Sequence, residues 1–176
     1  MRKLFIIAAA CGMAVVPAVS QEKKTGKSYV LKAARMFDGK SDSLTTPGVV
    51  VVQDGKIVGV GPSATVPAGA EAIDLGDATL LPGFIDAHTH LTMMYREDYA
   101  KAMLDSLQKP IPEMALDASV NARVTLLSGF TTVRDVGSRK YLDAGLRNAI
   151  NRGVVPGPRM LVAVHAIGAT GGHCDD

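Results

Sequence analysis

The second half of the sequence alternates between helical and extended patterns, and this alternation restricts the fold more than any other feature. Residues 98–108 and 112–127 are typical of helices, the second with apolar side chains at three- and four-residue spacing. A β-branched run at 130–136, a helical segment at 141–151 and an apolar run at 159–165 follow. This order predicts an α/β fold with a parallel sheet that is buried on both faces.

An apolar run that begins at a Pro-Gly turn and ends in two histidines carries the clearest chemical signal. Side chains alternate along a strand, so His88 and His90 are expected to point to the same face, with Asp86 one step deeper on it. Two imidazoles at a strand end are suitable ligands for a divalent metal such as zinc. The alternative is a pair of surface histidines in a turn. We favour the metal site because a strand and an aspartate precede the pair.

The residues before this run have the pattern of short strands. Asp54-Gly55 lies between two β-branched runs, which predicts a hairpin. Glycine and proline separate the other extended segments, as in a small β-sandwich or sheet layer. We therefore assign residues 29–80 to a small β-sandwich domain and residues 81–176 to three βα units. The expected strands of the first domain lie at 29–37, 48–53, 56–60, 71–75 and 78–81.

The amino terminus has the layout of a secretory signal peptide. Basic residues precede a long apolar run, which ends in the small-x-small site Ala18-Val19-Ser20. We expect residues 1–20 to be removed, residues 21–28 to form a polar linker, and the protein to be exported to the periplasm or secreted. Lipidation at Cys11 is a less favoured alternative, because the aliphatic residue preferred at the start of such a site is missing.

Composition excludes several other classes. Gly12 and Pro17 interrupt the first apolar run, which is short for a permanent membrane span. The 19 basic and 17 acidic residues nearly balance and form no basic patch with aromatics, which argues against nucleic acid as a partner. Loss of the leader would leave Cys174 alone, so no internal disulfide is expected.

Two segments resemble a known family. LLPGFIDAHTHL, at residues 80–91, resembles the first barrel strand of the amidohydrolase superfamily of metal-dependent hydrolases. ATGGHCDD, at residues 169–176, resembles a loop of its imidazolonepropionase-like and Xaa-Pro dipeptidase-like members. The resemblance implies a TIM-like (β/α)8 barrel in which His88 and His90 bind the more buried of one or two metal ions, with zinc the expected metal. It also implies that His173 contacts the substrate.

The chain is short for such a barrel. From Leu81 onward 96 residues hold three strand candidates, whereas a closed barrel needs eight strands and about 250 residues. We therefore expect an N-terminal fragment with an incomplete barrel. The resemblance places the remaining metal ligands and the catalytic aspartate beyond Asp176, so no catalytic residue is expected within the chain and the fragment alone is expected to be inactive.

Several residues keep two interpretations. Asp86 either tunes the metal centre from below or is a buried polar residue bonded to barrel backbone. Asp135 either reaches the barrel mouth or serves as a helix cap or an ion-pair partner of Arg134 or Arg139. His165 ends an apolar strand, where a satisfied structural histidine is expected. His173 either contacts substrate or is a solvated residue of a flexible loop.

The predicted function follows from these assignments. We expect an exported metal-dependent amidohydrolase that hydrolyses C–N bonds of a small molecule or dipeptide, with an Xaa-Pro dipeptide as the favoured substrate. The alternatives within the superfamily are a cyclic-amide hydrolase and a deaminase. A non-catalytic binding or structural remnant is the alternative of another class, although its unpaired strand edge would promote aggregation. A homo-oligomer is compatible with the sequence.

Overall fold

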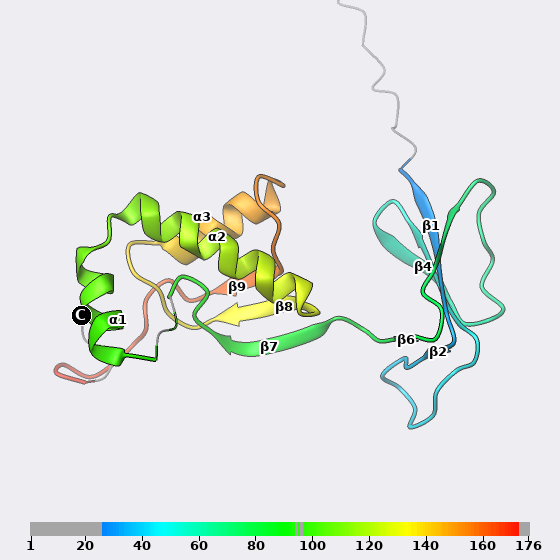
Figure 1. The fold of residues 1–176 in the computed structure, drawn as a ribbon, viewed down its shortest axis with the longest axis horizontal. Helices are drawn as coiled ribbons and strands as arrows, with labels where there is room; N and C mark the ends of the chain where they lie inside the picture. Colours follow the sequence, from blue (N-terminus) through cyan, green and yellow to red (C-terminus); the bar gives the residue numbers. More distant parts are fainter. Residues whose placement is uncertain (1–25, 94, 96, 173–176) are drawn as a thin grey trace, which may run out of the picture. The chain divides into compact units, whose positions relative to one another are not determined.

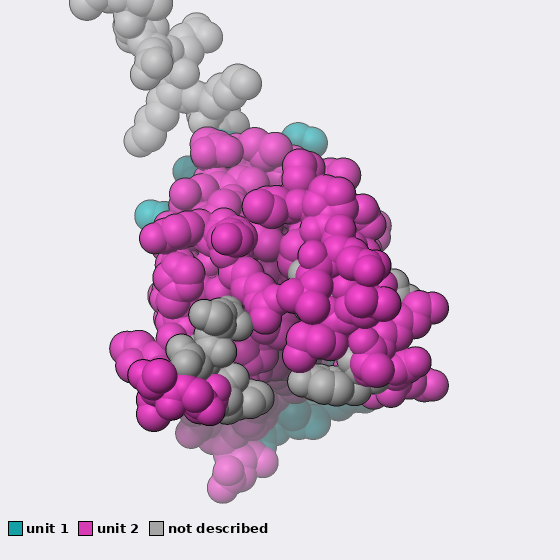
Figure 2. All heavy atoms as spheres, turned by 90° about the vertical axis from the view of Figure 1, so that its left-hand side faces the viewer, with its two compact units in different colours: residues 1–36, 43–80 teal, residues 37–42, 81–176 magenta. Residues whose placement is uncertain are grey.

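The computed structural model describes residues 26–172 except 94 and 96 (Figure 1). The predicted signal peptide, most of the linker, His173 and Cys174 lie outside the described residues. The chain divides into two compact units, coloured separately in Figure 2. Unit 1 contains residues 1–36 and 43–80, and unit 2 contains residues 37–42 and 81–176. No helix among the described residues is long and apolar enough to span a membrane.

Unit 1 is built from short strands in two sheets. Its four-stranded sheet has the order β4-β3-β1-β5, with β1 antiparallel to β3 and parallel to β5. A separate two-stranded sheet pairs β2 with β6. Val30 and Val51 face each other across the β1–β3 ladder and are buried in the core of this unit. The strands are β1 (Ser28–Ala33), β2 (Arg35–Met36), β3 (Gly48–Gln53), β4 (Lys56–Val60), β5 (Glu71–Asp74) and β6 (Thr79–Leu80).

The predicted hairpin is confirmed, whereas the first predicted strand is wrong in its extent. Asp54 and Gly55 join β3 to β4 with φ angles of 53° and 72°, the left-handed conformation that a tight hairpin turn of this kind requires. The extended run at 29–37 breaks at Ala34, whose N–H donates to the Gly76 carbonyl. The chain therefore passes from one sheet to the other at this point, which alternation in the sequence could not indicate.

Unit 2 is an α/β layer, as predicted. Its parallel sheet has the order β7-β8-β9, and α2 and α3 pack on it (Figure 1). The buried core lies between this sheet and these helices and includes Ala118, Ala122, Val133, Leu146 and Met160. The elements are β7 (Phe84–Thr89), α1 (Tyr99–Gln108), α2 (Ile111–Leu127), β8 (Phe130–Asp135), α3 (Leu142–Asn151) and β9 (Arg159–Val162).

The prediction of a sheet buried on both faces is wrong for the described residues. Val133 and Met160 are paired in register and face the helices, whereas Ile85 and Leu161 on the other face are 72% and 59% exposed. Both α2 and α3 lie on one side of the sheet. Each new strand is added next to the previous one in the same direction, through a crossover of the same hand. Crossovers of this kind place their helices on the same face of the sheet. This is the winding of a barrel wall rather than of a doubly wound sheet.

The third strand of unit 2 is shorter than predicted. β9 ends at Val162 instead of residue 165, because the Val164 N–H donates to the Asp143 carboxylate at 2.9 Å and Val164 adopts a φ of 68°. His165 consequently lies in a loop and is exposed, with its ring edge against Tyr141 at a centroid distance of 5.2 Å. The prediction that His165 ends the apolar strand is therefore wrong.

Candidate metal centre

The two histidines of the strand motif come together at the carboxyl end of β7. His88 is the penultimate residue of the strand, and His90 follows its last residue. Their ring centroids are 5.5 Å apart and the ring planes meet at 73°. Two imidazole groups at this distance match the donor chemistry of a divalent metal site, and both side chains are exposed. Metal binding by this pair stays a prediction.

A hydrogen bond defines which nitrogen of His90 is free. The His90 Nδ1 atom lies 3.0 Å from the carbonyl oxygen of Gly137, in the loop after β8. A carbonyl can only accept, so in the neutral form of the ring Nδ1 carries the proton and Nε2 has the lone pair. Histidines that bind metals are commonly oriented in this way by a backbone carbonyl. His90 is thus held in the form in which an imidazole binds a metal.

Asp86 contacts the backbone of the first histidine. Its Oδ1 atom accepts a hydrogen bond from the His88 N–H at 3.0 Å. In the ladder with β8, three steps along β7 from Asp86 to Thr89 correspond to two steps from Val133 to Asp135. This β-bulge, a feature found next to active sites, re-aims side chains. Strict alternation did not predict the bulge, and the two proposed roles of Asp86 stay predictions.

Asp135, the last residue of β8, is fully buried. Its Oδ2 atom accepts the Leu91 N–H at 2.7 Å, and its Oδ1 atom accepts the Gly137 N–H at 3.4 Å. The predicted pair with Arg134 is wrong, because consecutive strand residues point to opposite faces and the Arg134 Nε donates to the Ala87 carbonyl at 2.6 Å. Asp135 instead ties together the loops that follow β7 and β8.

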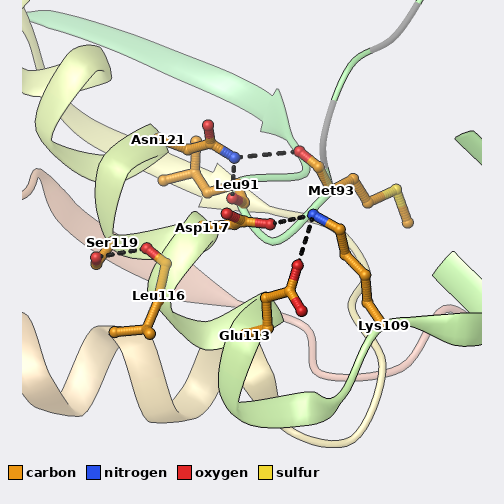
Figure 3. A network of polar contacts seen from close by, with 8 residues as sticks. All are labelled: Leu91, Met93, Lys109, Glu113, Leu116, Asp117, Ser119 and Asn121. Atoms are coloured by element: carbon orange, nitrogen blue, oxygen red, sulfur yellow. Dashed lines mark hydrogen bonds and ion pairs between the residues drawn. The ribbon is translucent and has the colours of Figure 1, made fainter. Parts of the chain in front are cut away.

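The loop after His90 is also held from the helix layer (Figure 3). Asn121 of α2 donates through Nδ2 to the carbonyl oxygens of Leu91 at 2.9 Å and Met93 at 3.2 Å. The Thr92 and Ser138 hydroxyl groups, both on buried residues, are 2.8 Å apart. Sequence reasoning missed these contacts, and the one available signal was a polar residue on the helix face that carries Ala118 and Ala122.

Lys109 fixes the turn between the two helices that precede β8 (Figure 3). Its Nζ atom is 2.6 Å from Asp117 Oδ2 and 3.4 Å from Glu113 Oε1. The hydrogen bond to Asp117 raises the pKa of Lys109 above its ordinary value. A charged hydrogen bond therefore connects the two helices where the chain turns from α1 into α2.

A second buried carboxylate organises the end of β9. Asp143, in the first turn of α3, accepts the Val164 N–H at 2.9 Å and the Ala144 N–H at 2.7 Å. The Ser138 N–H donates in turn to the Val164 carbonyl. Buried polar groups thus connect the loops after all three parallel strands, at the edge of the sheet where the histidine pair lies.

The described residues do not form a complete metal site. Within residues 26–172 without 94 and 96, no three His, Cys, Asp or Glu side chains form a group that could hold a metal ion. His173, the predicted substrate contact, lies outside the described residues. The two imidazoles fit a divalent ion as donors, but they do not complete the tetrahedral set that zinc takes in proteins.

Burial of Asp135 predicts a measurable pH dependence. Desolvation raises the pKa of its carboxyl, and the bonds from the Leu91 and Gly137 N–H groups offset only part of this. Between the ordinary carboxyl pKa of about 4 and the raised pKa, the folded chain keeps a proton that the unfolded chain has lost. The free energy of unfolding therefore falls as pH rises through this window. Urea titrations across the acid range should show this slope, reduced in Asp135→Asn; equal slopes would contradict the prediction.

Comparisons with known proteins identify the family and fold that the chain resembles. The profile of the Amidohydrolase family matches residues 79–173, more than half of the chain. A solved Xaa-Pro dipeptidase with bound methionine is 34% identical, with a TM-score of 0.70, over 85% of this chain and 36% of that one. A prolidase complexed with N-methylphosphonate-L-proline is 30% identical, with a TM-score of 0.70, over 84% of this chain and 34% of that one.

Curated relatives match a smaller part of the chain. The dihydroorotase of Mycobacterium tuberculosis is 34% identical over 84 residues, which cover 48% of this chain and 16% of the dihydroorotase. The chain thus spans about a third of the solved structures and a sixth of this enzyme. The family predicted from the motifs at residues 80–91 and 169–176 is confirmed: the chain belongs to the amidohydrolase family.

Proposed function

We propose that the chain contributes the first part of the metal centre of an exported hydrolase that cleaves C–N bonds, with Xaa-Pro dipeptides as substrates. The observation that carries this proposal is the convergence of His88 and His90, with the His90 proton placed on Nδ1 by the Gly137 carbonyl. The bound ion, with zinc the expected metal, would act as a Lewis acid that activates water and polarises the scissile carbonyl. This chain's residues hold two of its ligands and orient them.

The fold supports a position at the mouth of a barrel. The histidines lie at the carboxyl end of β7, and active sites of (β/α)8 barrels lie at the carboxyl ends of their strands. The helices α2 and α3 cover one face of the sheet, which agrees with the winding of such a barrel. The open face around Ile85 and Leu161 would then line the barrel interior.

The favoured substrate rests on the solved neighbours. Two of them are an Xaa-Pro dipeptidase and a prolidase, and each aligns with more than four fifths of this chain. An exported enzyme is also better suited to cleave short peptides than to carry out a step of intracellular catabolism. Two imidazoles alone do not complete a zinc site, so we propose that the chain by itself does not hydrolyse dipeptides.

The substrate test uses the full product of the gene in its source organism. We expect it, loaded with Zn²⁺, to release proline from a panel of Xaa-Pro dipeptides, and a His88→Ala, His90→Ala variant to release none. A cyclic amide and an aminopurine serve as comparison substrates. Ring opening of the cyclic amide, or ammonia release without proline release, would overturn the dipeptidase proposal in favour of a cyclic-amide hydrolase or a deaminase.

Export predicts a defined mature end. Cleavage after Ser20 would leave Gln21 as the first residue. We expect N-terminal sequencing of protein from the periplasm or medium to begin at Gln21, and an Ala18→Arg variant to accumulate uncleaved because the site needs small residues. A mature chain that begins at a lipid-modified Cys11 would contradict this prediction and indicate a membrane-anchored lipoprotein.

A further inference from the structure

The peptide that follows His90 is held on both sides by buried or half-buried side chains. The Leu91 N–H donates to Asp135 Oδ2 at 2.7 Å, and the Leu91 carbonyl accepts from Asn121 Nδ2 at 2.9 Å (Figure 3). The Leu91 side chain itself is buried in the core of unit 2. The backbone on the carboxyl side of His90 therefore has little freedom to rotate.

The residue whose carbonyl orients His90 also bonds to Asp135 through its N–H. Asp135 Oδ1 accepts the Gly137 N–H at 3.4 Å, and the Gly137 carbonyl lies 3.0 Å from His90 Nδ1. Hydrogen bonds connect the His90 ring to Gly137, Gly137 to Asp135, and Asp135 to Leu91. Leu91 is covalently joined to His90, so these contacts form a closed ring. Asp135 is the side chain that links Gly137, which contacts the His90 ring, to Leu91, which follows His90 in the chain.

A fully buried carboxylate at this position is unfavourable for stability alone. Burial of a carboxylate costs free energy that its bonds from backbone N–H groups offset only in part. From these contacts we propose that Asp135 is a positioning residue for His90, which holds the Nδ1–H form and aims Nε2 toward the metal site. The proposal rests on the metal site of the proposed function for its second part only.

Asp143 offers a matched control in the same unit. Asp143 is also fully buried and also accepts backbone N–H groups, but its bonds go to Ala144 and Val164. A role of Asp135 in stability alone predicts that Asp135→Ala and Asp143→Ala behave alike. A positioning role predicts a larger change of the His90 imidazole in Asp135→Ala than in Asp143→Ala, because Asp143 reaches the Gly137–Ser138 peptide only through Val164.

The first measurement is ¹⁵N NMR of the histidine side chains in the metal-free chain. We expect His90 as a single Nδ1–H tautomer in the wild type and in Asp143→Ala, and as a mixture of tautomers in Asp135→Ala. Asp135→Asn should give an intermediate result, because its amide oxygen can still accept one of the two N–H groups while its NH₂ group faces the other. Asn121→Ala, at a half-buried site, adds a variant that leaves the buried carboxylate in place.

The second measurement is Zn²⁺ affinity by calorimetry. Loss of a group that orients a metal ligand typically weakens binding about 10- to 100-fold, and we expect a loss in this range for Asp135→Ala. Amide hydrogen exchange of α2 and α3 checks that each variant is folded; where Asp135→Ala is not, Asp135→Asn is compared with Asp143→Asn. An unchanged His90 tautomer in folded Asp135 variants, or an equal change in the Asp143 variant, would overturn the proposal. Failure to cleave Xaa-Pro dipeptides would leave the tautomer result intact and overturn only the proposed substrate.

Discussion

Replacement of both histidines of the strand motif should abolish specific Zn²⁺ binding by the chain. His88 and His90 are the pair of described side chains whose rings converge at the candidate site, at a centroid distance of 5.5 Å. Loss of a group that only supports a metal ligand weakens affinity by up to about 100-fold. Loss of the ligands themselves should exceed this, so we expect no calorimetric signal in His88→Ala, His90→Ala at concentrations that saturate the wild type.

His165 provides the control for this experiment. Its imidazole is exposed in the loop after β9 and contacts the ring of Tyr141. His165→Ala removes an accessible imidazole from the same unit without changing the histidine pair, and should therefore bind Zn²⁺ like the wild type. Retained binding in the double variant, together with loss in His165→Ala, would place the metal site elsewhere and contradict the assignment of His88 and His90.

The substitution with the largest expected effect on stability is Gly48→Ala in unit 1. A Cβ atom at Gly48 would lie 2.6 Å from the carbonyl carbon of Arg35, closer still to its oxygen, and 3.0 Å from the Met36 Cβ. Two of these atoms belong to the backbone of β2 and cannot rotate away. Overpacking of this kind typically costs 1–3 kcal/mol, and we expect about 3 kcal/mol because the contact is with backbone.

Gly145 of α3 is the matched glycine. A Cβ atom there meets nothing within 4 Å, so Gly145→Ala should stabilise the helix by about 0.5–1 kcal/mol. Hydrogen exchange measured peptide by peptide reports each unit separately, which a global melting curve would not. Faster exchange in the β1–β3 ladder is expected for Gly48→Ala, and slower exchange in α3 for Gly145→Ala. Unchanged protection of the β1–β3 ladder in Gly48→Ala would show that β2 can move away.

Local patterns in the sequence were sufficient for the elements of unit 2. The helix predicted at 141–151 is observed as Leu142–Asn151, and the strand predicted at 130–136 as Phe130–Asp135. Both depend on hydrophobic periodicity and on glycines at their ends, which are properties of neighbouring residues. The two-residue spacing of His88 and His90 was local in the same sense, and their rings do converge.

Tertiary contacts decided the details that a local pattern cannot contain. β9 ends early because Val164 bonds to Asp143, 21 residues away along the chain. Asp135 and Asn121 bond to Leu91 from 44 and 30 residues away, so their role in holding the loop after His90 had no signal in the spacing of residues. Periodicity indicates which side chains share a face of a helix or strand. Only the folded chain determines which distant backbone N–H and carbonyl groups a buried polar side chain meets, because those partners come together when the strands pair and the helices pack on them.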